Sequence, residues 1–234
     1  MNGENDEDLA LEAVDTGTAA GVAVAARAES AVEQLWGSIF LSPERTAPKS
    51  ITVTAAESRE GATQVATALA LTGSSAEHGL RIALVDFNVR RPMIARIFGI
   101  RPSPGVAEVI TKGTPIDSAL VPGPNQRLNI LPAGGAADAS PPLLQSRQAG
   151  ELITRLSADH DHLIIDAPAV NRSAIAQALA GYTDGVLIVT KAGVTRRESV
   201  AEAKKRIEYA QGKVIGVVLN QRQFPIPGFL YRRL

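Results

Sequence analysis

Short apolar runs alternate with longer amphipathic segments along most of the chain. Runs of four to seven mainly apolar residues predict strands, and segments with apolar positions three and four residues apart predict helices. The predicted strands are residues 51–55, 81–86, 128–131, 162–166, 185–190 and 214–220. The predicted helices are residues 27–41, 62–76, 92–97, 105–111, 142–158, 173–180 and 197–210.

Apolar strands separated by helices are typical of a parallel sheet covered on both faces. We therefore expect an α/β fold: a doubly wound, mainly parallel sheet of the P-loop type with helices on both faces. Ligands of such sheets bind beyond the carboxyl ends of the strands. Two predicted strands end in a carboxylate, Asp86 and Asp166, and the strand ending at Ala55 leads into a turn and a helix. A loop and two carboxylates at one edge suit a nucleotide with its magnesium ion.

The 234 residues suit one α/β domain with flanking segments. Residues 1–25 are acidic and rich in small side chains, which predicts a disordered tail. Residues 26–50 are expected to form an N-terminal helix and a linker, and residues 51–221 the α/β domain. Residues 222–234 combine arginines with large apolar side chains. They are interpreted as a basic, apolar docking segment, or as a segment that folds back on the domain.

The net charge of zero conceals an uneven distribution along the chain. Residues 1–26 hold six of the 24 acidic side chains and none of the 24 basic ones, so residues 27–234 carry 24 basic against 18 acidic side chains, a net charge of +6. Aromatic residues make up only 4%, which argues against a base-stacking surface, and no nucleic-acid partner is expected.

Several kinds of site and location are excluded by composition. Cysteine is absent, so disulfides and thiolate metal sites are excluded, and three scattered histidines do not suggest a metal site. His160 and His162 are expected in a solvated loop. No apolar run approaches the roughly 20 residues of a membrane-spanning helix, and the N-terminus is acidic rather than basic. We expect a cytoplasmic protein that reaches the inner membrane only through a partner.

A degenerate phosphate-binding loop follows the first predicted strand. The P-loop pattern is G-x-x-x-x-G-K-[ST], and residues 56–63 read AESREGAT. The second glycine and the hydroxyl are in place, but alanine stands at the position of the lysine that neutralises phosphate charge. The candidate nucleotide-binding residues are Arg59, Gly61, Ala62, Thr63 and Gln64.

Three longer stretches carry a more specific resemblance. ITVTAAESREGATQVATALA, ALVDFNVRRP and HLIIDAPAV resemble, in order and spacing, the cytoplasmic domain of bacterial tyrosine autokinases of capsule and exopolysaccharide systems. That family lies within the wider group of MinD and ParA ATPases. The resemblance covers roughly residues 30–220. It implies ATP and Mg²⁺ as cofactors and a membrane polysaccharide co-polymerase as partner.

The resemblance assigns roles to three side chains. It implies Thr63, Asp86 and Asp166 as magnesium ligands and the two aspartates as catalytic residues. Asn88 stands where the family's second motif has another aspartate.

Other matching positions depart from the family pattern. Arg59 replaces a glycine of the loop, and Ile175 stands where an aspartate is usual after the Walker B strand. Because several of these changes fall in one site, we expect ATP and Mg²⁺ to bind weakly if at all.

Two other family features are also altered. The family's E-x-x-R-x-x-R helix, which builds a ring of subunits, matches Ser30, Glu33 and Trp36, so that ring is not expected. Trp36 is interpreted as an anchor for a different partner or as a core residue. The family's C-terminal tyrosine cluster is reduced to Tyr231, the candidate phosphoacceptor.

The sequence therefore favours a pseudokinase: a degenerate relative of the tyrosine autokinases that acts as a cytoplasmic regulatory or structural partner of a polysaccharide co-polymerase. Two alternatives remain at this stage. One is an active tyrosine autokinase or ATPase with an atypical loop, because Thr63, Asp86 and Asp166 are kept. The other is a positioning ATPase similar to MinD and ParA.

Overall fold

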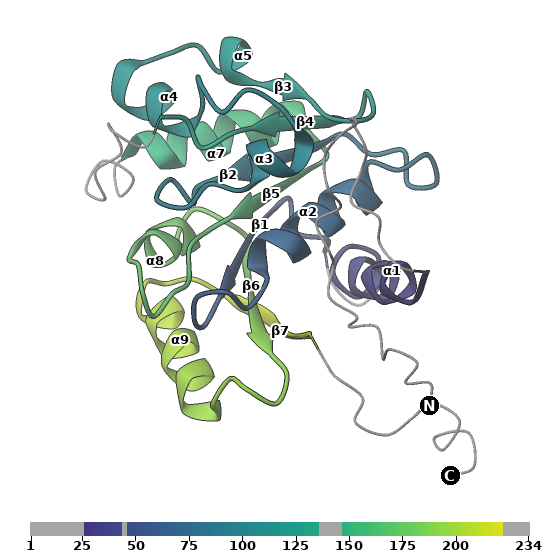
Figure 1. The fold of residues 1–234 in the computed structure, drawn as a ribbon, viewed down its shortest axis with the longest axis vertical. Coiled ribbons are helices and arrows are strands. Elements are labelled where there is room, and N and C mark those ends of the chain that lie inside the picture. Colours follow the sequence, from purple (N-terminus) through teal and green to yellow (C-terminus); the bar gives the residue numbers. More distant parts are fainter. Residues whose placement is uncertain (1–25, 44–45, 136–146, 222–234) are drawn as a thin grey trace, which may run out of the picture.

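One sheet of seven strands organises the computed structural model, which describes residues 26–43, 46–135 and 147–221. The strand order is β3-β4-β2-β5-β1-β6-β7 (Figure 1). All neighbours are parallel except β3 and β4. The strands are β1 (Ser50–Ala55), β2 (Ile82–Asp86), β3 (Val121–Pro122), β4 (Leu128–Leu131), β5 (His162–Asp166), β6 (Gly185–Lys191) and β7 (Val214–Asn220).

Helices cover both faces of this sheet (Figure 1). Helices α1 and α2 lie on one face, and α7, α8 and α9 lie on the other. Side chains of the central strands alternate between the two layers, as the pleat of a strand requires. In β2, for example, Leu84 packs toward α2 and Val85 toward α7. The helices are α1 (Ala26–Phe40), α2 (Ala62–Gly73), α3 (Ile94–Phe98), α4 (Val106–Lys112), α5 (Ile116–Ala119), α7 (Arg147–Asp159), α8 (Ile175–Ala180) and α9 (Arg197–Tyr209).

The predicted fold class is confirmed: the sheet is mainly parallel, and all six predicted strands are present. β3 and α5 were not predicted, because they are only two and four residues long. β3 contains Pro122 and pairs antiparallel at the edge of the sheet, where a missing N–H donor is tolerated. None of the described helices has the length and apolar character needed to cross a bilayer.

Helix α1 is attached to the domain by an aromatic cluster. Trp36 is fully buried and stacks on Phe40, with ring centroids 4.1 Å apart. Gly73 of α2 allows this approach, because a Cβ there would lie 2.2 Å from the indole ring. Glu33 contacts His78 at 3.1 Å. The structure therefore places Trp36 in the core, and the interpretation of Trp36 as an exposed anchor for a partner is wrong.

The expectation of a solvated loop around the histidines is also wrong. His160 follows the last residue of α7 and is buried, with Nδ1 2.9 Å from the carbonyl oxygen of Leu156 and Nε2 2.9 Å from Nδ2 of Asn129. His162 is the first residue of β5, and its Nδ1 donates to the carbonyl oxygen of Pro48 at 2.8 Å. Burial lowers the pKa of His162. Both histidines have structural roles, because His160 joins α7 to β4 and His162 bonds to the segment before β1.

The burial of Trp36 gives a direct stability test. Replacing it with alanine removes the indole from between α1 and α2, and we expect the unfolding free energy to fall by about 3–5 kcal/mol. Urea unfolding followed by circular dichroism measures this without the tryptophan signal. Leu41→Ala, at a side chain that is 59% exposed, serves as control and should change little. A loss below about 1 kcal/mol for Trp36→Ala would contradict the packing of α1 on the domain.

Candidate functional site

The loop between β1 and α2 turns through two residues in the left-handed region. Gly61 has φ of 91° and Arg59 has φ of 67°. Position 61 also has no room for a side chain, because a Cβ there would lie 2.1 Å from Nδ2 of Asn220. Arg59 adopts this conformation with a side chain, at a cost of about 1–2 kcal/mol. The loop thus turns sharply at two positions, one of which is not glycine.

Contacts with the protein itself hold this loop in place. The buried carboxylate of Glu60 accepts hydrogen bonds from the backbone N–H of Glu57, at 2.8 Å, and from the hydroxyl of Thr195. Nδ2 of Asn220 donates to the carbonyl oxygen of Glu60 at 3.0 Å. These contacts could not be predicted from the sequence, because Thr195 and Asn220 lie more than 130 positions further along the chain. One loop amide is therefore already bonded to a carboxylate of the protein.

Two carboxyl groups lie together at the centre of the sheet. Asp86 and Asp166 are directly opposite in the pairing of β2 with β5, and both are fully buried. Thr63, in the first turn of α2, donates to Oδ2 of Asp166 at 2.7 Å. Asp86 accepts backbone N–H groups from Asn88 at 2.9 Å and Ile94 at 3.3 Å. Oδ1 of Asp166 has no hydrogen-bond partner within the described residues.

Burial makes this pair hold protons at higher pH than ordinary aspartates. It raises the pKa of Asp86 from 3.8 to about 6, against the opposing effect of the backbone N–H groups of Asn88, Ile94 and Met93. Burial also raises the pKa of Asp166 well above its usual value, and the nearby charge of Asp86 raises it further. The hydroxyl of Thr63 acts in the opposite direction. Near neutral pH the pair therefore carries less than two full negative charges.

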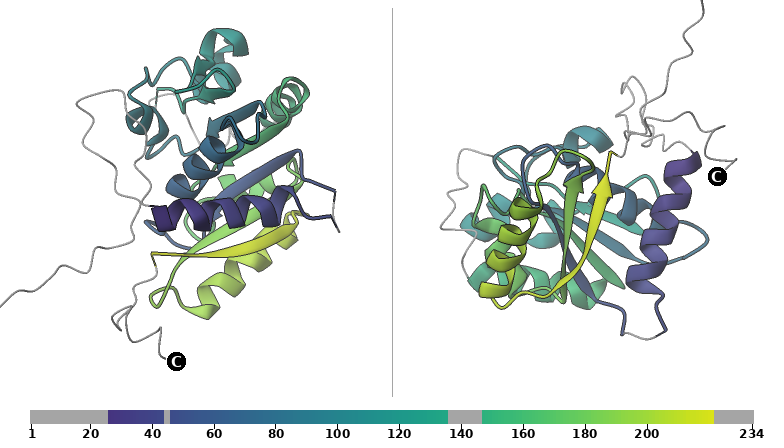
Figure 2. Two further views of the ribbon diagram at one scale, coloured as in Figure 1. Left: turned by 90° about the vertical axis from the view of Figure 1, so that its right-hand side faces the viewer. Right: turned by 90° about the horizontal axis from the view of Figure 1, so that it is seen from below.

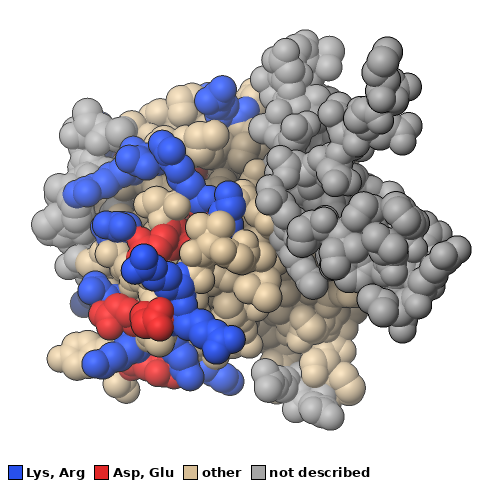
Figure 3. Space-filling view, turned by 60° about the horizontal axis from the view of Figure 1, so that its bottom comes forward, with Lys and Arg blue, Asp and Glu red and all other residues tan. Residues whose placement is uncertain are grey.

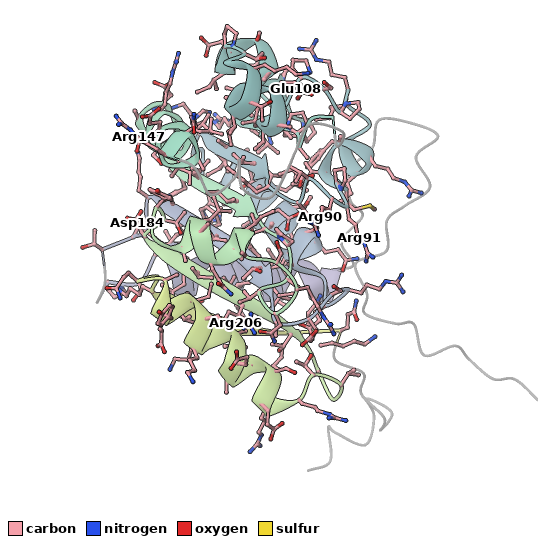
Figure 4. The ribbon with its side chains drawn as sticks, turned by 90° about the vertical axis from the view of Figure 1, so that its left-hand side faces the viewer. Arg90, Arg91, Glu108, Arg147, Asp184 and Arg206 are labelled. Carbon is pink, nitrogen blue, oxygen red and sulfur yellow. The ribbon has the colours of Figure 1, made fainter. Side chains whose placement is uncertain are left out.

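A cavity of about 640 Å³ opens along the loop. Its size suits a small ligand. All the candidate loop residues line it, whereas Asp86 and Asp166 are fully buried and are not among its lining residues. The lining residues from the loop and from the segment after β2 are Glu57, Ser58, Arg59, Glu60, Gly61, Ala62, Thr63, Gln64, Asn88, Arg90, Arg91 and Met93. Figure 4 shows Arg90 and Arg91 next to each other at the edge opposite Arg147 and Asp184.

Other residues singled out in the sequence lie elsewhere. Ile175 is buried in the layer formed by α8, so this position contributes nothing to the cavity. Tyr231 and the proposed docking segment lie outside the described residues.

A second hollow of about 530 Å³ lies on the other side of the loop. Its basic lining residues are Arg59, Arg172, Lys191 and Arg196, and the last three were not singled out in the sequence. Arg172 follows β5, Lys191 is the last residue of β6 and Arg196 precedes α9, so no spacing along the chain could indicate that they meet. Figure 3 shows lysine and arginine side chains across one face of the molecule, with patches of acidic side chains among them.

The raised pKa values predict how stability depends on pH. The pKa of Asp86 is higher in the folded protein than in the unfolded chain, so the folded protein binds more protons than the unfolded chain between about pH 4 and 7. The unfolding free energy therefore falls as pH rises through this window. Asp166→Asn removes one of two adjacent carboxyls and keeps an oxygen for Thr63. We expect it to raise the unfolding free energy at pH 8 by about 1–3 kcal/mol, and less at pH 5.

Urea unfolding at both pH values measures this difference. Asp117→Asn, at an exposed aspartate, is the control and should change stability by less than about 0.5 kcal/mol. An equal change in the unfolding free energy at pH 5 and pH 8, in either direction, would contradict the raised pKa values of the carboxyl pair.

Sequence comparison finds relatives among bacterial tyrosine kinases, whereas no family model matches the chain. The tyrosine-protein kinase YwqD of Bacillus subtilis is 28% identical over 175 residues, which is 75% of this chain and 73% of YwqD. The succinoglycan biosynthesis transport protein ExoP of Rhizobium meliloti is 29% identical over 149 residues, 62% of this chain but only 19% of ExoP.

Comparison with solved structures also finds kinase domains of bacterial tyrosine kinases. The kinase domain of VpsO is 28% identical, with a TM-score of 0.69 over 74% of this chain and 85% of that domain. The kinase domain of the Escherichia coli tyrosine kinase ETK has a TM-score of 0.77 at 18% identity, over 85% of this chain and 79% of that one. The septum site-determining protein MinD of Pyrococcus horikoshii, solved with Mg-ADP, has a TM-score of 0.63 at 18% identity, over 79% and 76% of the two chains. The chain is therefore a homologue of bacterial tyrosine kinases and has the α/β fold that their kinase domains share with MinD.

Proposed function

We propose that this protein is a pseudokinase, which keeps the fold of a tyrosine kinase but does not transfer phosphate. The observation that carries the proposal is the methyl group of Ala62 in the wall of the cavity, at the position of the P-loop lysine. Phosphoryl transfer depends on neutralising the charge that develops on the transferred group, and a methyl group cannot do this. Loss of a charge-assisted contact costs about 1.5–3 kcal/mol, or roughly 10- to 150-fold in binding.

Two further features of the cavity also weaken the attraction for a nucleotide with its magnesium ion. Asn88 lines it where the family has a second acid, so one negative charge for a metal ion is missing. The carboxylate of Glu60 is bonded to a loop amide, which places a negative charge within the loop that would surround phosphate. Each feature lowers the attraction for a nucleotide with its magnesium ion.

The donor set for a magnesium ion is nevertheless partly kept. Mg²⁺ prefers oxygen ligands, and Thr63, Asp86 and Asp166 supply them around the unpartnered Oδ1 of Asp166. These residues would hold the ion, whose contribution is to neutralise phosphate charge. This observation favours the second candidate function, an active autokinase or ATPase with an atypical loop. The third, a positioning ATPase, is supported only by the fold shared with MinD.

The proposed partner is the membrane polysaccharide co-polymerase of an exopolysaccharide, capsule or adhesin system. Support comes from ExoP, a transport protein of succinoglycan biosynthesis, of which this chain matches about one fifth. A domain that is part of the transport protein in one case can act as a separate subunit in another. In this role the protein works by contact, in the cytoplasm at the inner membrane.

Restoring the loop in steps tests the proposal. We expect weak binding of Mg-ADP to the unmodified protein by calorimetry, and at least about tenfold tighter binding for Ala62→Lys because the ammonium returns. Adding Arg59→Gly should improve the affinity beyond the sum of the two single effects, since both residues act on one phosphate. Ala201→Lys, which adds the same charge at an exposed position of α9, is the matched control. Low-micromolar binding of Mg-ADP by the unmodified protein would contradict the proposal.

A further inference from the structure

The second hollow, beside the phosphate loop, has walls from three separate segments of the chain. One wall is the loop itself, residues 57–60, and another is Arg172, which follows β5. The third wall lies within residues 191–199, between the end of β6 and the first turn of α9. Figure 2 shows α9 on the opposite side of the sheet from α1, and no described residue of α1 lines the hollow. The hollow is therefore formed by the α/β domain alone.

Hydrogen bonds join these three walls to one another. The hydroxyl of Thr195 donates to the carboxylate of Glu60, which joins the third wall to the loop. Glu57 accepts from the side chains of Arg172, at 2.9 Å, and Asn171, at 3.2 Å, which joins the loop to the segment after β5. Nδ2 of Asn171 also donates to a backbone carbonyl oxygen in the first turn of α9, at 3.0 Å. Each wall is therefore bonded to the other two, which preorganises the hollow.

The acidic side chains of the hollow are used in these contacts, whereas most of its basic side chains are not. The carboxylates of Glu57 and Glu60 each accept two hydrogen bonds from the protein. Arg59, Lys191 and Arg196 make no side-chain hydrogen bond or ion pair with any other described residue. The four basic and two acidic lining residues give the hollow a net charge of +2. This charge favours a dianion.

The donors of the hollow suit a phosphate group. Arg59 and Arg196 carry planar guanidinium groups, each of which can bond to two phosphate oxygens, and Lys191 adds a compact charge. In addition, α9 begins beside the hollow without a side-chain cap, so its first N–H groups are free to bond to an anion. Phosphate groups carry about two negative charges near neutral pH. The volume of about 530 Å³ has room for such a group and a small organic substituent.

We propose that the second hollow binds a phosphate dianion, at a site separate from the larger cavity on the other side of the loop. Lys191 and Arg196 line the second hollow only, whereas Arg90 and Arg91 line the larger cavity only. The two sites can therefore be tested independently. The proposal goes beyond the pseudokinase function and does not depend on it, because the walls and cations of this hollow are present whether or not the loop binds nucleotide.

Titration of the full chain with inorganic phosphate at pH 7.5, followed by the backbone amide signals in nuclear magnetic resonance, tests the proposal. NaCl keeps the ionic strength constant, so that screening does not change. We expect the amide signals of residues 195–199 to shift and to saturate at millimolar phosphate. The double variant Lys191→Gln and Arg196→Gln should weaken this binding at least about tenfold, because it removes two charged donors. The rest of its spectrum shows whether the variant is folded.

A matched control separates this site from the larger cavity and from a general change of charge. The double variant Arg90→Gln and Arg91→Gln loses the same charge beside the larger cavity, and it should leave the phosphate affinity at residues 195–199 within about twofold. Equal weakening by the two double variants would overturn the proposal. Shifts confined to residues 88–91 would also overturn it, because phosphate would then bind in the larger cavity alone.

Two further titrations identify the source of the phosphate group. Phenyl phosphate should bind several-fold more tightly than inorganic phosphate if the hollow takes an ester, because the ring can cover Val194, which is 65% exposed. Equal affinities would assign the hollow to the free ion. Vesicles that contain phosphatidic acid present the same group on a membrane. Vesicle binding that Lys191→Gln with Arg196→Gln abolishes, without a saturable response to either soluble phosphate, would overturn the proposal in favour of a lipid surface.

Discussion

The hydrogen bond from Thr63 to Asp166 joins the phosphate loop and helix α2 to the centre of the sheet. The rest of the site depends on this contact, because it fixes the start of α2 above the two carboxyl groups. Ala62, next to Thr63 in the loop, carries no charge, and burial raises the pKa values of both acids.

The buried acids and the basic side chains around the loop form two distinct parts of the site. Burial favours protonation of the acids, which lowers their negative charge and with it their attraction for a cation. The two hollows beside the loop are lined by basic side chains, which attract anions. The hydrogen bonds of Glu60 with Thr195, with Asn220 and with the amide of Glu57, here called the brace, hold the loop in shape.

The sequence was sufficient for the sheet and for the two carboxylates, because both depend on local patterns. Asp86 and Asp166 each end an apolar run, and parallel strands bring such ends to one edge. The brace around Glu60 could not be predicted, since its contacts join residues 135 and 160 positions apart. Arg172, Lys191 and Arg196 were missed for the same reason. The role of Trp36 was left open, because the spacing of α1 gives a buried face but not the surface that covers it.

The central claim is that the fold has been kept while phosphoryl transfer has been lost. Incubating the full chain with ATP and Mg²⁺ and measuring its intact mass tests this claim most directly. The account predicts that no phosphate is added, at any ATP concentration that a cell maintains. Addition of phosphate that is abolished by both Asp166→Asn and Tyr231→Phe would contradict it, because the carboxyl pair would then serve catalysis.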